Sequence, residues 1–194
     1  MSQRIGVLAL QGNYTLHQKA LEALSVDAPL IYKPHELINC DGLIIPGGES
    51  TALLRLMTPL NWQTAIRDFK SNHKKIFGTC AGMILCAHDV TPEQETLALI
   101  DITVSRNAYG RQLDSHVAKG QCHTASLGAD ELEMVFIRAP KVTRVGSAVT
   151  VHATCGGVPV LVQQDNVLCA SFHPEFLPSA TVHRYFIEQL EPEG

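Results

Sequence analysis

The segment Ile76-Phe77-Gly78-Thr79-Cys80-Ala81-Gly82-Met83 contains a G-x-C-x-G motif between an apolar run and a helical pattern. This motif is the thiol counterpart of the G-x-S-x-G nucleophile elbow, in which the nucleophile projects from a sharp strand-to-helix turn. Glycines on both sides relieve the crowding that such a turn imposes. The segment predicts a strand over Lys75–Phe77, a helix that begins over Ala81–Ala87 and a candidate nucleophile at Cys80. The alternative is a buried cysteine beside packing glycines.

Strand-like runs alternate with helical patterns on both sides of this segment, which is typical of βαβ units. In the first half, strands are expected at Arg4–Leu10, Leu30–Tyr32 and Gly42–Ile45, and helices after Asn13, from Pro34, after Ser50 and over Trp62–Phe69. In the second half, strands are expected at Ile102–Val104, Met134–Ile137, Val149–Ala153, Val158–Val162 and Val167–Phe172, before a closing helix over Ala180–Leu190. We therefore expect one α/β domain over residues 1–194, with three αβα layers and a mostly parallel central sheet to which antiparallel hairpins are added.

Composition excludes several classes of partner. The chain has 194 residues and a formal net charge of −4, so it carries no basic footprint for nucleic acid. No apolar run reaches the roughly 18 residues that a membrane span needs. The apolar run Ile5–Leu10 ends in Gln11-Gly12 instead of a signal-peptide cleavage site, so we expect a cytoplasmic protein. The six cysteines include no C-x-x-C pair, which predicts reduced thiols and no metal site.

A histidine and a carboxylate lie two residues apart in Ser171-Phe172-His173-Pro174-Glu175, at the end of an apolar run. In extended backbone such residues face the same way, and Pro174 biases His173 toward extended geometry. Glu175 can then hold one ring nitrogen while the other faces a thiol, as a nucleophile–base–orienter arrangement requires. The alternative is a strand-end turn with a solvated Glu175. The other eight histidines, His17 and His183 among them, lack such a setting and are interpreted as surface or core residues.

A glycine turn, Pro46-Gly47-Gly48-Glu49-Ser50-Thr51, lies between an expected strand and an expected helix. It lacks the G-K-[ST] ending of a phosphate-binding loop, so nucleotide binding has no support. In a parallel sheet the turn and the cysteine elbow lie at the same edge. The N–H groups of Gly48 and Ala81 are therefore candidate donors to an oxyanion. A helix start capped by Ser50 is the structural interpretation, and both can hold together.

Together these segments resemble the class I, or triad, glutamine amidotransferases, and within them the glutaminase subunits of pyridoxal 5′-phosphate synthase. The similarity runs from about Ile5 to the final helix. The cysteine elbow and the H-P-E segment define only the superfamily. The more specific segments are Gly6-Val7-Leu8-Ala9-Leu10-Gln11-Gly12, Pro46-Gly47-Gly48-Glu49-Ser50-Thr51, Arg106-Asn107-Ala108-Tyr109-Gly110-Arg111-Gln112 and Phe136-Ile137-Arg138-Ala139-Pro140.

The resemblance implies a nucleophile at Cys80, a general base and acid at His173, and an orienting carboxylate at Glu175. It also implies that Gln11 lies near the oxyanion hole, where contact with the synthase subunit organises the site. That subunit is the implied partner and receives the ammonia, so pyridoxal phosphate is a product of the assembly and no cofactor is expected here. The residues implied to hold the substrate L-glutamine are Gly48, Glu49, Ser50, Arg106, Ile137 and Arg138.

Several alternatives stay open at this point. Arg106 or Arg138 can instead be structural ion-pair partners, and the stretches Asp89–Glu95 and Leu113–Leu127 depart from the family pattern. Three other functions compete: the glutaminase of imidazole glycerol phosphate synthase, a hydrolase of γ-glutamyl peptides that needs no partner, and a partner-binding module with a decayed site. The G-G-E-S-T and R-N-x-x-G-R-Q segments argue against the first, and the intact triad argues against the last.

Overall fold

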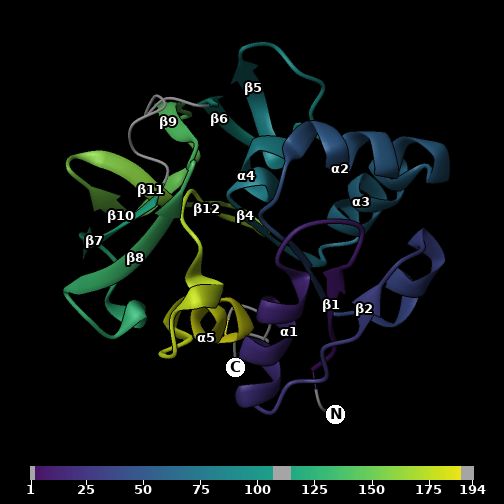
Figure 1. The fold of residues 1–194 in the computed structure, drawn as a ribbon, viewed down its shortest axis with the longest axis horizontal. Coiled ribbons are helices and arrows are strands. Elements are labelled where there is room, and N and C mark those ends of the chain that lie inside the picture. The colour runs from purple at the N-terminus through teal and green to yellow at the C-terminus, as the bar shows by residue number, and fades with distance from the viewer. Residues whose placement is uncertain (1–2, 107–114, 189–194) are drawn as a thin grey trace.

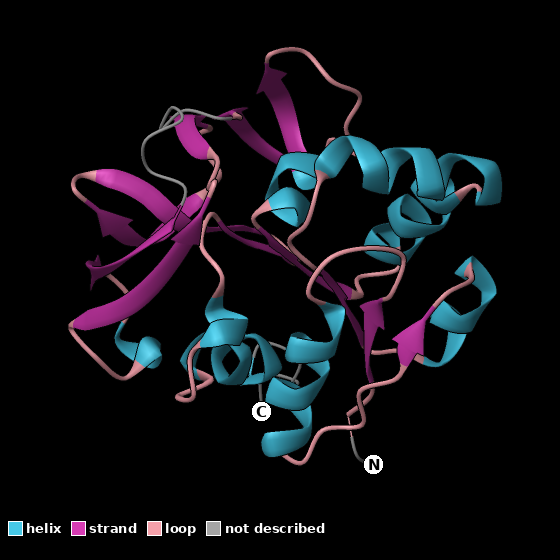
Figure 2. Cartoon of the chain, viewed as in Figure 1, coloured by secondary structure: helices cyan, strands magenta, loops and turns pink. Residues whose placement is uncertain are grey.

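The structure is a computed structural model that describes residues 3–106 and 115–188. Within these residues, nine strands form one sheet in the order β2-β1-β3-β4-β12-β11-β10-β7-β8 (Figures 1 and 2). The first five strands in this order run parallel to one another, as expected for βαβ units. They are β2 (Leu30–Ile31), β1 (Ile5–Leu8), β3 (Gly42–Ile45), β4 (Lys75–Thr79) and β12 (Val167–Ala170).

Beyond β12 the sheet continues with antiparallel strands, which confirms the expected additions. These are β11 (Val158–Gln164), β10 (Thr150–Cys155), β7 (Ser115–Cys122) and β8 (Glu131–Ile137). The sequence did not predict β7, because its side chains are mostly polar and mostly outside the core. Its strand geometry comes from pairing with β8 along seven residue pairs.

A second, three-stranded sheet was not predicted. Among the described residues it consists of β5 (Ala87–Thr91), β6 (Ile100–Ser105) and β9 (Lys141–Val145), in the order β5-β6-β9. The sequence indicated only the middle strand and assigned it to the central sheet, which is wrong. Strand β5 follows directly after helix α4 (Ala81–Cys86), and in β9 only Val142 is buried. Neither outer strand therefore carries a run of buried apolar residues that marks it in the sequence.

Helices cover both faces of the parallel half of the sheet (Figure 1). The side chains of α1 (Tyr14–Ala23) and α5 (Thr181–Glu188) join one core cluster, together with Val7, Ile44 and Phe77 of the strands. The other cluster unites α2 (Ser50–Met57), α3 (Trp62–Ser71) and α4 with Leu8, Leu43, Ile45 and Ile76. Alternate strand residues thus serve opposite faces, as strand geometry requires. The three-layer αβα prediction is confirmed. Short 3₁₀ turns lie at η1 (Pro34–Asn39), η2 (Thr58–Leu60), η3 (Ala125–Leu127) and η4 (Pro174–Phe176).

The N-terminal caps of two helices differ from those that the sequence predicted. The residue that caps α2 is Glu49 and not Ser50: its carboxylate accepts the N–H groups of Thr51 at 3.2 Å and Ala52 at 2.8 Å. Asn13 does precede α1, but its side chain makes no capping hydrogen bond. None of the helices within residues 3–106 and 115–188 is long and apolar enough to cross a membrane.

The contact between α4 and β3 yields a test of the elbow. A Cβ placed on Gly82 would overlap the carbonyl oxygen of Ile45, which belongs to the backbone and cannot turn away. Gly82→Ala should therefore lower the free energy of unfolding by about 1–3 kcal/mol, the usual cost of overpacking. Gly128→Asn is the control, because Gly128 has φ +72° with open space around it and Asn tolerates that conformation. Equal urea midpoints for the two variants would contradict this contact.

Candidate active site

Cys80 stands at the apex of the turn between β4 and α4. Its backbone has φ 48° and ψ −102°, a positive-φ conformation that non-glycine residues rarely adopt. The backbone is held there by the Cys80 N–H, which donates to the carbonyl oxygen of Ala170 at 2.8 Å. The thiol Sγ lies 3.8 Å from the carbonyl oxygen of Ile137. Strained backbone of this kind recurs at nucleophile elbows, where it exposes the reactive atom.

His173 and Glu175 form a buried pair beside this thiol. The imidazole Nδ1 lies 2.7 Å from Oε1 of Glu175. The backbone N–H of His173 donates to the carbonyl oxygen of Val135 at 2.8 Å. The local backbone differs from the expected extended strand: Pro174 begins the 3₁₀ turn η4, which contains Glu175. The turn still brings the carboxylate against the ring. Asn13 adds a second, longer donor to Oε1 at 3.4 Å.

The protonation of this pair follows from its surroundings. Burial alone would lower the pKa of His173, but hydrogen bonds with Cys80 and Glu175 outweigh it and raise the pKa to about 10. Burial would likewise raise the pKa of Glu175, yet its attraction to His17 and the hydrogen bond from His173 lower it to about 2. Near pH 7 the pair is an imidazolium facing a carboxylate, so the ring can supply a proton to a leaving group.

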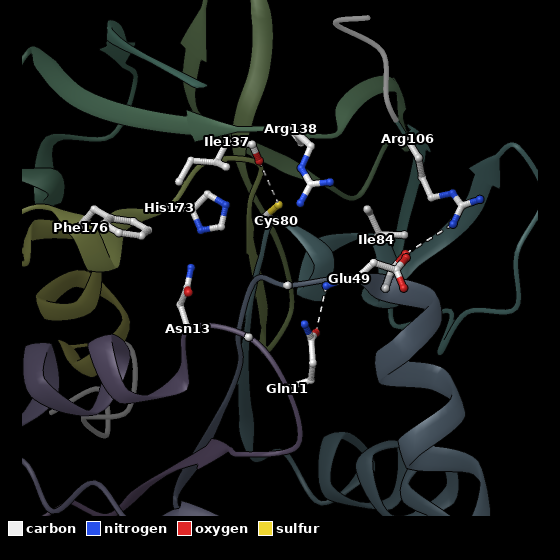
Figure 3. Close-up of a pocket in the computed structure, with 13 residues that line it drawn as sticks. Gln11, Asn13, Glu49, Cys80, Ile84, Arg106, Ile137, Arg138, His173 and Phe176 are labelled. Carbon is white, nitrogen blue, oxygen red and sulfur yellow. Dashed lines mark hydrogen bonds between the residues drawn. The ribbon is translucent and has the colours of Figure 1, made fainter. Parts of the chain in front are cut away.

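A cavity of about 400 Å³ opens beside the thiol (Figure 3). In the close-up, the side chains of Cys80 and His173 face it from one side and those of Arg106 and Glu49 from the other. This volume suits a small metabolite such as an amino acid. The lining residues are Gln11, Gly12, Asn13, Gly48, Glu49, Ser50, Cys80, Ile84, Arg106, Ile137, Arg138, His173 and Phe176.

The glycine turn after β3 packs against His173 through Gly47 and lines the cavity through Gly48. A Cβ on Gly47 would lie only 2.5 Å from Cε1 of His173, and one on Gly48 would overlap Oε1 of Gln11. The Gln11 side chain accepts the N–H of Glu49 at 2.9 Å. Gln11 is therefore hydrogen-bonded to the same loop that carries the candidate oxyanion donor. The other candidate, the Ala81 N–H, is in the first turn of α4 and has no intrahelical acceptor.

The opposite wall is built around Arg106. Its guanidinium contacts Oε1 of Gln94 and lies 3.5 Å from the hydroxyl of Ser50, which itself donates to Gln94 at 2.9 Å. Hydrogen bonds from Thr51 lower the pKa of Glu49, with a smaller contribution from Arg106. Neither Arg106 nor Arg138 forms an ion pair with a residue that the structure describes. The structural ion-pair alternative therefore has no support among those residues.

The structure thus brings all the predicted pocket residues to one cavity, with Glu175 and Ala81 directly behind it. Arg138 contributes from a backbone with φ 43° at the end of β8. Of the segment Arg106–Gln112, only Arg106 lies within the described residues. Among those residues, no group of three or more His, Cys, Asp or Glu side chains could hold a metal ion.

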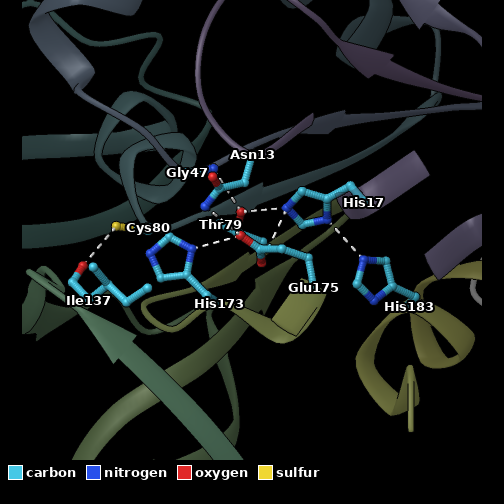
Figure 4. Close-up of polar contacts among 9 residues, drawn as sticks. All are labelled: Asn13, His17, Gly47, Thr79, Cys80, Ile137, His173, Glu175 and His183. Atoms are coloured by element: carbon cyan, nitrogen blue, oxygen red, sulfur yellow. Dashed lines mark hydrogen bonds and ion pairs between the residues drawn. The ribbon is translucent and has the colours of Figure 1, made fainter. Parts of the chain in front are cut away.

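Sequence reasoning missed residues that contact the site from elsewhere in the chain. Asn13 was expected only as a helix cap, and Gln94 stands in a stretch that offered no pattern. His17 and His183 were interpreted as ordinary histidines, but both are fully buried behind Glu175 (Figure 4). The spacing of His17 in the sequence could have indicated that it is buried. It stands four residues before Leu21, so both side chains lie on the buried face of α1.

Comparison with known proteins identifies the family of this chain. Residues 7–192 match the SNO glutamine amidotransferase family. The chain belongs to this family. It is 45% identical to "Pyridoxal 5'-phosphate synthase subunit PdxT" of Desulforudis audaxviator over 97% of this chain and 99% of that protein. The protein of the same name from Koribacter versatilis is 44% identical, over 96% of this chain and 95% of that protein.

Solved structures agree with this membership. A "Crystal structure of glutamine amidotransferase" matches with a TM-score of 0.89 and 39% identity, over 96% of this chain and 98% of that one. The "glutaminase domain with bound acivicin" of Trypanosoma brucei CTPS matches with a TM-score of 0.65 and 14% identity, over 97% and 94% of the two chains. The second match shows the fold alone. The fold of this chain therefore recurs in a glutaminase domain of distant sequence.

The two shifted pKa values predict how stability depends on pH. His173 is raised from 6.5 to about 10, so its contribution is complete below pH 6.5 and is lost as pH rises through about 10. Glu175 is lowered from 4.5 to about 2, so its contribution is present above pH 4.5 and is lost as pH falls through about 2. The pair should stabilise the fold most between pH 4.5 and 6.5.

The measurement is the unfolding free energy of the wild type and of the double variant His173→Gln/Glu175→Gln, by urea titration at about pH 5.5 and about pH 9.5. The difference should be smaller at the higher pH. The exposed pair Lys119–Glu131, 3.6 Å apart, gives the control when both residues are changed to Gln, because exposed pairs contribute little. A difference as large at the higher pH as at the lower one would contradict the assignment of charges.

Proposed function

We propose that the chain hydrolyses L-glutamine to L-glutamate and ammonia through Cys80, His173 and Glu175, and that it passes the ammonia to the synthase subunit of pyridoxal 5′-phosphate synthase. One observation carries the catalytic part. A cysteine on a strained turn stands beside an imidazole that is held by a buried carboxylate, at the rim of a cavity lined by two arginines. Membership of a glutamine amidotransferase family supports the choice of substrate.

The chemistry is acyl transfer in two halves. His173 holds the thiol proton of Cys80 while the sulfur attacks the side-chain amide carbon of glutamine, and the N–H groups of Gly48 and Ala81 bind the oxyanion. His173 donates a proton to the amide nitrogen, the C–N bond breaks, and ammonia leaves a γ-glutamyl thioester on Cys80. His173 then takes a proton from water, which attacks the thioester and releases glutamate and the thiol.

The far wall of the cavity suits the amino-acid end of the substrate. The α-carboxylate needs a guanidinium, and Arg106 and Arg138 supply the two that line the cavity. The α-ammonium needs acceptors, which the carboxylate of Glu49 and the carbonyl oxygen of Ile137 offer. Ser50 completes the set through its contact with Arg106. Glu49 already accepts hydrogen bonds from Thr51 and Ala52, so it offers the ammonium an anion of fixed position.

The partner follows from the fate of ammonia. Free ammonia is protonated in water and loses its nucleophilicity, so an amidotransferase gains from delivering it directly to a second active site. The names of the relatives, each a subunit of pyridoxal 5′-phosphate synthase, support that synthase as the partner. Gln11, hydrogen-bonded to the loop that carries Gly48, is the proposed point at which docking organises the oxyanion hole. We also propose that residues 1–194 form one domain and that the protein acts in the cytoplasm.

The first test measures ammonia release from L-glutamine by the purified chain, with and without the synthase subunit. We expect the rate to rise when the synthase is added and to fall to background in Cys80→Ala, because Cys80 is the only thiol among the described residues that line the cavity. Cys86→Ala is the matched control, since Cys86 is a buried cysteine six residues on that lies outside the cavity lining. Equal rates with and without synthase would leave a cysteine hydrolase but refute the partner. Unchanged rates in Cys80→Ala would refute the nucleophile.

The second test concerns substrate recognition. Arg138→Gln should raise KM for glutamine by about 10-fold to 100-fold, since a hydrogen bond to a charged group contributes roughly 1.5–3 kcal/mol. The value of kcat should change much less, because the arginine binds substrate and transition state alike. Arg144→Gln is the control: Arg144 is exposed and pairs with Asp101 on the small sheet. A KM that is the same in both variants would remove Arg138 from the binding set.

A further inference from the structure

The carboxylate of Glu175 has one oxygen on the triad and one behind it. Oε1 lies 2.7 Å from His173, whereas Oε2 makes no hydrogen bond with any residue that the structure describes. Oε2 instead faces Nε2 of His17 at 3.4 Å, and both side chains are fully buried (Figure 4). A buried anionic oxygen is costly unless a positive group or dipole faces it. The orientation of His17 therefore matters to the triad.

His17 is itself held on two sides. Its Nε2 lies 3.1 Å from the hydroxyl oxygen of Thr79, and its Nδ1 lies 2.9 Å from Nε2 of His183. The Thr79 hydroxyl also accepts the N–H of Gly47 at 3.0 Å. The chain of contacts thus joins α1, β4, α5 and the glycine turn directly beneath the triad. The Nδ1 of His183, at the far end, is buried without a hydrogen bond to a described residue, as is Oε2 of Glu175 at the near end.

These contacts fix where the protons lie. An ionised carboxylate can only accept, and a bare Nε2 would direct a lone pair at Oε2, so the favoured position of the proton on His17 is Nε2. A neutral His17 then has a bare Nδ1, which accepts from Nε2–H of His183. The opposite arrangement would turn a lone pair of His17 toward the carboxylate and leave a buried N–H of His183 without an acceptor. Both effects are unfavourable, and the unpaired donor alone costs about 1–3 kcal/mol.

The charges around His17 agree with this arrangement. The titratable groups that face it are Glu175, His173 and His183. Burial lowers the pKa of His17 to about 4, against the attraction of Glu175, and burial also lowers the pKa of His183 to about 3. Both rings are therefore neutral near pH 7, and the imidazolium of the group is His173.

We propose that His17, supported by His183, is a positioning residue for the triad: its Nε2–H faces Oε2 of Glu175 and keeps Oε1 on the ring of His173. The inference rests on the proposed function of the triad. It gives the two oxygens of Glu175 different partners, so the carboxylate cannot turn without losing one of them. Through Thr79 the same imidazole also supports the N–H of Gly47, next to the candidate oxyanion donor.

The direct test is the tautomer of His17, measured by ¹⁵N NMR on the full chain with ¹⁵N-labelled histidine and assigned by comparison with His17→Gln. The account predicts a neutral ring near pH 7 with the proton on Nε2. A proton on Nδ1, or an imidazolium, would overturn the proposal. This measurement needs no substrate, so it can fail or succeed independently of the proposed function.

The kinetic test uses glutamine hydrolysis by the complex with the synthase subunit. His17→Leu should lower kcat by about 10-fold to 100-fold with KM nearly unchanged, as misplacement of a catalytic group does. The acid limb of its pH profile should move to higher pH, because losing the N–H raises the pKa of Glu175. His17→Gln keeps an amide N–H near the position of Nε2 and should recover most of kcat.

His152→Leu is the matched control. His152 is also buried and hydrogen-bonded, but its partners are Thr124, Gln163 and Tyr185, away from the triad. The His152→Leu variant should be less stable than the wild type but should keep its kcat and pH profile. A kcat in His17→Leu no lower than in His152→Leu would reduce His17 to a structural residue. If His17→Leu does not fold, the tautomer and the kcat of His17→Gln decide between the two roles.

Discussion

The contact between Nδ1 of His173 and Oε1 of Glu175, at 2.7 Å, is the interaction on which the rest of the site depends. It holds an imidazole beside Cys80 and keeps both partners charged in a place where burial alone would neutralise them. Both partners follow the carboxyl end of β12, with Glu175 in η4, and the thiol follows the end of the neighbouring parallel strand β4. The parallel register of these two strands is therefore what brings nucleophile and base together.

Around this contact the structure separates positioning from binding. Behind Glu175, buried polar groups from α1, β4 and α5 fix the carboxylate, and close glycine packing fixes the turns on either side. In front of Cys80, the cavity walls carry charges of both signs, which suit the α-carboxylate and the α-ammonium of an amino acid. The positioning groups are buried and packed, whereas the binding groups line the cavity and are held by hydrogen bonds, Arg106 to Ser50 and Glu49 to Thr51 and Ala52. This division is the one expected of a site built on strand ends.

The sequence predicted those parts of the fold whose signals are local. The apolar run before Cys80 and the flanking glycines indicated β4, the elbow and the nucleophile together. Pro174 was interpreted as favouring an extended strand end, whereas it begins the 3₁₀ turn that contains Glu175. Strand β7 was missed because its side chains are polar and its conformation comes from pairing. His17, Asn13 and Gln94 were missed as site residues because only tertiary packing brings the first two to the triad and Gln94 to Arg106. Single-chain patterns carry no information on which distant side chains meet.

The central claim is that Cys80 carries the γ-glutamyl group. It is tested most directly by rapid acid quench of the chain, in complex with the synthase subunit, during turnover of L-glutamine, followed by mass spectrometry of its peptides. The account predicts one γ-glutamyl addition, on the peptide that contains Cys80, and none in the absence of glutamine. Ammonia release without any such adduct, or an adduct confined to another cysteine, would contradict it.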